Sequence, residues 1–233
     1  WGSSLAQPYS LTFRTGAVTP NFSIPMGGNV LFLNSSDTFL PARATNIFNV
    51  NISLGAISLD EFLAMVSSGG YQVMESFQPA QPQTWSQALN TRSDINETVQ
   101  LQLNPAGDAL APGLYFMRMR FDQPNLTGGP FLIVVGGSQL TYKHSPSDVL
   151  VWSVDVNNFS PRSGSQVTIY DENGAVLADG QTQADGVFRS AIPVQEDSYR
   201  ETVAVLGQPG QADFGLALAS WNQGISPWDF DIP

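Results

Sequence analysis

Short apolar runs separated by glycine and proline are the feature that most constrains the fold of this chain. The 233 residues include 16 Pro and 21 Gly, and the runs between them are rich in Val, Ile, Phe, Tyr and Thr. Such runs, bounded by turn residues, predict β-strands. Strands that recur about every 8–12 residues are typical of β-sandwiches. The pattern therefore predicts an all-β protein.

The second half of the chain has the clearer strand pattern. Its Asn173-Gly174 pair predicts a tight type I′ hairpin, because both central residues of that turn need positive φ. Asp185-Gly186 predicts a second turn. Seven strands are expected around these turns, at residues 139–143, 148–156, 166–170, 175–178, 187–191, 201–206 and 214–221.

The segment 148–156 alternates between two faces, as a strand does. One face carries Val149, Val151, Ser153 and Asp155. The other is wholly apolar, and we expect it to face the core; its members are Leu150, Trp152, Val154 and Val156.

The first half is β-rich but less regular. Ser58 and Glu61 form a capping box, which predicts a short helix over 59–66 that ends before Gly69-Gly70. Two strands are expected to flank a turn at Pro112-Gly113. The strands expected in this half are 9–14, 29–33, 45–54, 98–103, 114–121 and 131–135.

Gly136-Gly137 marks the expected domain boundary, because a Gly-Gly-Ser segment cannot form a strong strand interior. We expect separately folded domains at residues 1–137 and 138–233, with a modest contact between them. The tail 224–233 is expected to connect to a following domain, because Trp228 and Phe230 would otherwise be exposed. The start at Trp1 indicates a processed product or a piece of a longer chain.

Charge and composition exclude several classes of partner and site. The net charge is −11, and only nine Lys and Arg are scattered along the chain, so binding to nucleic acid or an anionic membrane surface is not expected. The absence of Cys excludes disulfides, thiolate zinc sites, a cysteine nucleophile and an internal thioester. No apolar run is long enough to span a membrane.

No constellation of residues predicts a catalytic, cofactor or metal site. His144 is the single histidine and lacks the G-x-S-x-G context of a nucleophile, so we interpret it as a residue of a loop or strand end. The acids that could share a calcium ion follow no EF-hand spacing and are interpreted as ordinary turn residues. They are Asp171, Glu172, Asp179 and Asp185.

Aromatic residues and sequons allow a second interpretation, which involves carbohydrate. Four tryptophans could form a carbohydrate-binding platform, although Trp152 and Trp221 are expected to pack in the core; the four are Trp85, Trp152, Trp221 and Trp228. Glycan sites in a eukaryotic secreted protein, or a Ser/Thr/Asn-rich surface in a bacterial one, would both account for the six Asn-x-Ser/Thr sequons. These lie at Asn21, Asn34, Asn51, Asn96, Asn125 and Asn158.

The order of motifs in residues 140–230 resembles the macroglobulin-like domains of bacterial alpha-2-macroglobulins. The resemblance rests on the strand LVWSVDV, on Tyr170-Asp171 followed by the Gly174 and Gly186 turns, and on the terminal SPWDF segment at 226–230. In the first half, the segment APGLY at 111–115 resembles a hairpin of the preceding domain of that family.

The resemblance implies two consecutive seven-stranded antiparallel β-sandwiches, macroglobulin-like and related to the immunoglobulin and fibronectin type III folds, with a short helix in the first. It implies a scaffold fragment of an extracytoplasmic protease-trapping inhibitor, with no enzyme activity of its own. Its partners would be neighbouring domains of the parent, and target proteases only through the full-length protein. The alternative is a cell-surface adhesin or carbohydrate-binding module. Fold analogy alone does not decide between them.

Overall fold

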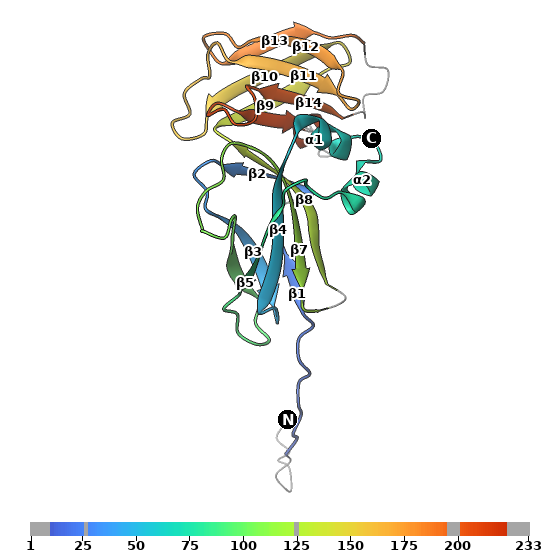
Figure 1. The fold of residues 1–233 in the computed structure, drawn as a ribbon, viewed down its shortest axis with the longest axis vertical. Coiled ribbons are helices and arrows are strands. Elements are labelled where there is room, and N and C mark those ends of the chain that lie inside the picture. Colours follow the sequence, from blue (N-terminus) through green and yellow to red (C-terminus); the bar gives the residue numbers. More distant parts are fainter. Residues whose placement is uncertain (1–9, 26–27, 124–125, 195–200, 223–233) are drawn as a thin grey trace, which may run out of the picture.

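The strands of the molecule form four sheets in two halves. The computed structural model describes residues 10–25, 28–123, 126–194 and 201–222. Each sheet takes its strands from only one side of Gly137, and the second half lies at one end of the elongated first half (Figure 1). Within the described residues no helix is long and apolar enough to cross a membrane.

The first half pairs a five-stranded sheet with a three-stranded one. The larger sheet has the order β2-β8-β7-β4-β5, and its strands are Val30–Asn34, Thr127–Gly136, Gly113–Phe121, Asn49–Ile57 and Gln83–Ala88. The smaller sheet, β1-β3-β6, consists of Asn21–Ser23, Phe39–Thr45 and Glu97–Gln102. β2 pairs with β8 in parallel, whereas the other pairs are antiparallel.

This half differs from the expectation in several ways. The structure describes eight strands here instead of seven, including β1, β3 and β5, which the sequence did not indicate. The strands on either side of Pro112-Gly113 do not form a hairpin, because β6 pairs with β3 and β7 pairs with β4 and β8. Residues 10–14 form no strand, and Leu11 and Phe13 are exposed. An alternating pattern without a neighbouring strand to pair with does not form a sheet.

The second half contains the seven expected strands, with small differences at their ends. One sheet has the order β13-β10-β9, from Val187–Ala191, Asp148–Asp155 and Ser138–His144. The other has the order β12-β11-β14-β15, from Val176–Gln181, Gln166–Asp171, Thr202–Leu206 and Gly215–Leu218. A 3-10 turn at Ala219–Asn222 follows β15.

The hairpin between β11 and β12 forms at the expected position but with a different turn. Gly174 has a φ of 81°, whereas Asn173 is not among the residues with positive φ, so the turn is not type I′. The carboxylate Oδ1 of Asp171 accepts hydrogen bonds from the amides of Asn173 and Ala175 at 2.9 and 2.8 Å. Because this aspartate fixes the turn, the left-handed conformation is needed only at the glycine.

Two helices pack beside the first half. Helix α1 spans Leu59–Val66, as predicted, and Ser58 and Glu61 exchange the two hydrogen bonds of the capping box. That helix ends before Gly69-Gly70, as expected, and the same two glycines start a second helix, α2, at Gly70–Ser76. A Cβ on Gly70 would overlap the carbonyl of Met65, so only glycine lets the second helix turn so closely against the first.

Each pair of sheets encloses its own core, which confirms the sandwich fold. The expected core face of β10 was wrong. Val149, Val151 and Ser153 are buried, whereas Trp152 is 45% exposed on the outer face of its sheet. Both faces of β10 are rich in apolar residues, so alternation alone did not distinguish the core side.

Candidate functional site

A third apolar cluster joins the two halves, and we call it the joint. It lies between the outer face of the five-stranded sheet, the two helices and the outer face of β14 and β15 (Figure 1). The first half contributes Ile57, Phe62, Leu63, Met65, Met74, Leu114, Phe116, Leu132 and Val134. The second half contributes Val203, Val205, Phe214, Leu216 and Leu218.

Strands that are apolar on both faces build this joint. In β8, Ile133 and Val135 point into the core of the first half, whereas Leu132 and Val134 point into the joint. β14 is divided in the same way between the joint and the core of the second half. A strand buried on both faces has a continuous apolar sequence instead of an alternating one. The continuous apolar runs at 131–135 and 202–206 are therefore explained by strands that are buried on both faces, one in the joint and one in the core of their own half.

The contact between the halves is not modest, which corrects the expectation from sequence. Five side chains of the second half are buried in the joint, each at most 3% exposed. Full burial of an aliphatic or aromatic side chain contributes about 1.5–3 kcal/mol. Their sum, on the order of 10 kcal/mol before entropy losses, is comparable with the whole stability of a domain.

The Gly136-Gly137 step is packed against the second half. The amides of Gly137 and Ser138 both donate to the carbonyl of Phe214, at 3.0 and 3.2 Å. A Cβ on Gly137 would overlap the carbonyl oxygen of Ala212, and one on Gly136 would lie 2.9 Å from that of Phe214. Glycine is required here by the close approach of another backbone segment, so this boundary is a rigid contact.

Arg162 holds the same step from the other side. Its guanidinium donates to the carbonyl of Gly137 at 2.9 Å and to the hydroxyl of Ser138 at 3.0 Å. It also pairs with the Asp155 carboxylate at 2.7 Å. The backbone amide of Asn157 and, more weakly, Arg162 hold the pKa of Asp155 below its usual range. This network fixes the chain where it passes from one half to the other.

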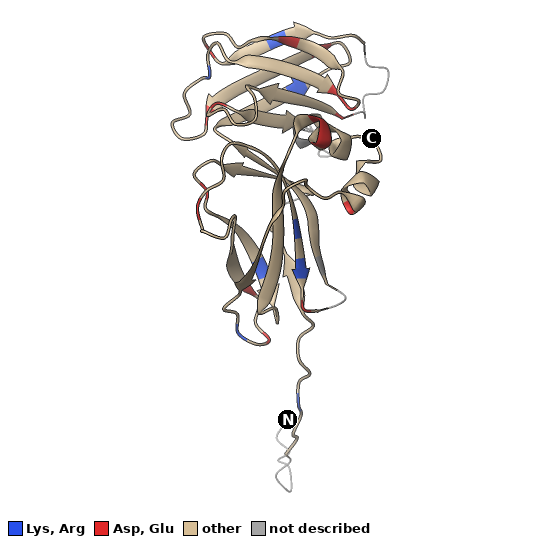
Figure 2. Ribbon diagram, in the orientation of Figure 1, with Lys and Arg blue, Asp and Glu red and all other residues tan. Residues whose placement is uncertain are grey.

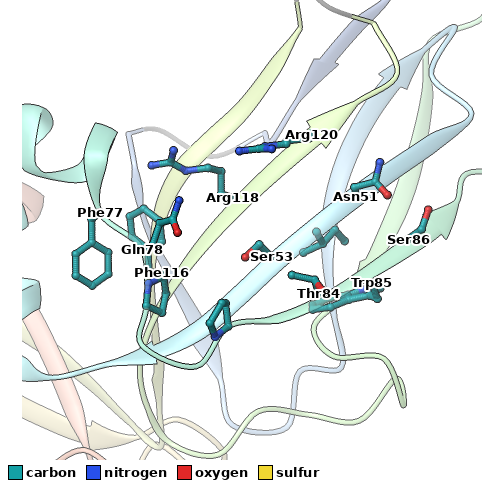
Figure 3. Close-up of a pocket in the computed structure, with 13 residues that line it drawn as sticks. Asn51, Ser53, Phe77, Gln78, Thr84, Trp85, Ser86, Phe116, Arg118 and Arg120 are labelled. Atoms are coloured by element: carbon teal, nitrogen blue, oxygen red, sulfur yellow. The ribbon is translucent and has the colours of Figure 1, made fainter.

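A groove of about 530 Å³ occupies the uncovered part of the five-stranded sheet's outer face (Figure 3). Arg118 and Arg120 of β7 lie on this face, and the register places Ser53 and Asn51 of β4 beside them. Thr84 and Ser86 of β5 continue the two rows. One wall is the segment from Phe77 to Pro82 that follows α2.

Contacts of the Phe77–Pro82 segment mark where the joint ends and the groove begins. The ring of Phe77 packs edge-on against Phe116, with centroids 5.1 Å apart. Pro79 lies over Gly55, where a Cβ would be only 2.5 Å from the Cβ of the proline. Arg118 donates from Nη2 to the carbonyls of Met74 and Glu75 at 2.7 and 3.0 Å, which satisfies the end of α2.

The residues weighed as catalytic or metal-binding from sequence are spread over the second half. His144 lies at the end of β9, where its ring stacks on Tyr142, while Ser145 hydrogen-bonds to Asp148 instead of to the imidazole. Asp171 and Asp185 each accept amides in their own turns. In the described part of the chain no three His, Asp or Glu residues gather as a metal site would require.

The tryptophans do not form a shared platform in the part of the chain that the structure describes. Trp85 is half-buried against the core of the first half, whereas Trp152 lies on the second half. The side chain of Trp221 and all of Trp228 lie outside the described residues, as does the 226–230 motif. Of the six sequon asparagines, Asn125 is also outside them, and Asn51 lies in the groove.

The basic groove and the joint match no sequence motif. The joint has a signal in the sequence, namely consecutive apolar residues in two strands. The groove has a weaker one: the outward residues of β7 change from Leu114 and Phe116 to Arg118 and Arg120 along one strand.

Comparison with known proteins gives a family match for the second half and a fold match for most of the chain. Residues 138–233 match the family described as bacterial alpha-2-macroglobulin MG3 domain. No curated protein matches the chain.

Solved structures of related domains have the same fold. A fragment of Escherichia coli alpha-2-macroglobulin spanning domains NIE-MG1 matches with a TM-score of 0.61 and 17% identity, over 85% of this chain and 96% of the fragment. The longer MG0-NIE-MG1 fragment gives 0.62 and 15%, over 86% of this chain and 64% of that one. Salmonella alpha-2-macroglobulin gives 0.56 and 16%, and the match spans 86% of this chain and 12% of that protein. Residues 138–233 are therefore similar to the bacterial alpha-2-macroglobulin MG3 domain family, and the chain has the fold of macroglobulin-like β-sandwich domains.

Proposed function

We propose that this chain is a rigid two-domain scaffold segment of a bacterial alpha-2-macroglobulin-like protease-trapping inhibitor. Residues 1–137 and 138–233 are its two domains, and its partners are neighbouring domains of an extracytoplasmic parent. The observation that carries the proposal is the joint, in which five buried side chains of one domain fuse it to the other. A trap that rearranges after cleavage of its bait region needs parts that keep their shape during the change.

The segment performs no chemistry in this proposal. Capture of a protease would depend on a bait region, and in many members of the family on a thioester, in other parts of the parent. The chain contains no Cys, so it cannot supply a thioester itself. The isolated chain is expected neither to hydrolyse substrates nor to inhibit a protease at equimolar concentration.

The parent polypeptide provides the test. Trypsin held by the intact parent should still cleave a small chromogenic substrate but not a large protein. Leu132→Asp in the joint should abolish that protection, and Val176→Asp, at an exposed position of β12 outside the joint, should preserve it. Stoichiometric inhibition by residues 1–233 alone, or specific binding on a glycan array, would contradict the scaffold role.

A further inference from the structure

The five-stranded sheet carries two arginines and no carboxylate. None of its strands contains Asp or Glu, and Figure 2 shows the basic positions of β7 without acidic residues on the neighbouring strands. The whole chain has 20 acidic and nine basic residues, so two neighbouring cations without an acidic partner are unusual here. Among the described residues, neither Arg118 nor Arg120 forms a salt bridge.

The geometry of the pair favours an extended anionic ligand. Arg118 and Arg120 are two residues apart on one strand and point to the same face, so their Cα atoms are roughly 6.6 Å apart. Their guanidinium groups are like charges on one face, and an anion bound between or beside them would offset their mutual repulsion. An extended peptide has the same two-residue repeat, so acidic side chains at alternate positions can each meet one guanidinium.

The floor of the groove supplies further hydrogen-bonding groups. The side chains of Asn51, Ser53, Thr84 and Ser86 line it, and none of them forms a hydrogen bond within the described residues. The Nε–H of Arg118 is buried and has no hydrogen-bond partner there. These amide and hydroxyl groups can bind the carbonyls and amides of a peptide backbone, which a simple anion does not offer.

We propose that this groove docks an extended acidic polypeptide segment with carboxylates at alternate positions. The positive charge of the groove within a chain of net charge −11 supplies the attraction, and the matched two-residue repeat supplies the specificity. Arg120 is exposed, and its side chain forms no hydrogen bond or salt bridge with the described residues, so it is the main contact for the ligand. Arg118 contributes while it also holds the end of α2.

An NMR titration of the ¹⁵N-labelled chain tests the proposal. The probe is the peptide acetyl-Ser-Glu-Ser-Glu-Ser-amide, and its matched control has Gln in place of both Glu. The acidic peptide should shift the amides of residues 51–53, 84–86 and 118–120, and its affinity should fall at 300 mM NaCl because salt screens the charges. Arg120→Gln should weaken binding about fivefold or more, whereas Arg189→Gln, an exposed arginine of the second half, should leave it unchanged.

Several results would overturn the proposal. Equal binding of the Glu and Gln peptides would show that charge does not direct docking. Equal losses in Arg120→Gln and Arg189→Gln would show that only net charge matters. Inorganic phosphate that gives the same shifts with the same affinity would identify a general anion site instead of a peptide site. Absence of any shift at millimolar peptide would also reject it.

Discussion

The outer face of the five-stranded sheet has two regions with opposite character. Where β7 carries Leu114 and Phe116, the face is apolar and covered by the helices and the second half. Four residues further along the same strand, where β7 carries Arg118 and Arg120, the face is polar, basic and open. The Phe77–Pro82 segment separates them. One strand is thus part of a buried apolar layer at one end and of an open polar face at the other.

The largest expected effect comes from a charge placed in the covered region. Leu132 is fully buried in the joint, so Leu132→Asp should lower the free energy of unfolding of the first half by about 3–5 kcal/mol, because an unpaired carboxylate would lose its hydration. Thr84→Asp, on the exposed region of the same face, should change it by less than about 0.5 kcal/mol. Urea denaturation measures both, and similar losses would mean that the two regions do not differ in burial.

The Gly136-Gly137 link between the two halves should be nearly as sensitive to substitution. Gly137→Ala would push a methyl group against the carbonyl of Ala212, which should cost about 1–3 kcal/mol. Gly16→Ala is the matched control, because nothing lies within 4 Å of the added Cβ. Thermal denaturation of the two variants gives the difference. An unchanged melting temperature for Gly137→Ala would show that the two backbones can separate there without loss.

A smaller effect is expected within the core of the second half, away from the joint. Burial raises the pKa of Tyr142 to about 12, although its hydrogen bond to Thr202, at 2.8 Å, opposes this. The neutral form is favoured on folding, so the stability it contributes is complete below pH 10, the pKa of unfolded tyrosine, and is lost as the pH rises from 10 towards 12. Tyr142→Phe should cost about 1 kcal/mol at pH 8.

The difference between the wild type and Tyr142→Phe should therefore shrink, and then reverse, above pH 10. Urea titrations at pH 8, 10 and 11 measure it, and the other tyrosines cancel in the comparison. A constant difference across this range would mean that Tyr142 ionises in the folded protein as it does in water.

Local chemistry made part of this fold predictable. The Ser58 and Glu61 capping box located α1, and turn residues located the strands of the second half. The edge strand β5 was missed because its sequence, QTWSQA, is mostly polar and packs only one aromatic side chain inward. β10 was assigned the wrong core face because Trp152 increased the apolar character of the side that faces out.

The joint and the groove depend on contacts between residues far apart in the sequence. The runs at 131–135 and 202–206 indicated burial but not that they pack on each other's sheets. The change from Phe116 to Arg118 is visible in the sequence. Only the course of the Phe77–Pro82 segment in the structure shows where the covered part of the sheet's outer face ends. Long-range packing of this kind is not encoded in the period of a single strand.

Differential scanning calorimetry of residues 1–233 can establish whether the joint makes the two halves one cooperative unit. We expect a single transition, with a calorimetric enthalpy equal to the van't Hoff enthalpy, and its separation into two transitions in Leu132→Asp. Two resolved transitions in the wild type, or a calorimetric enthalpy well above the van't Hoff value, would contradict it.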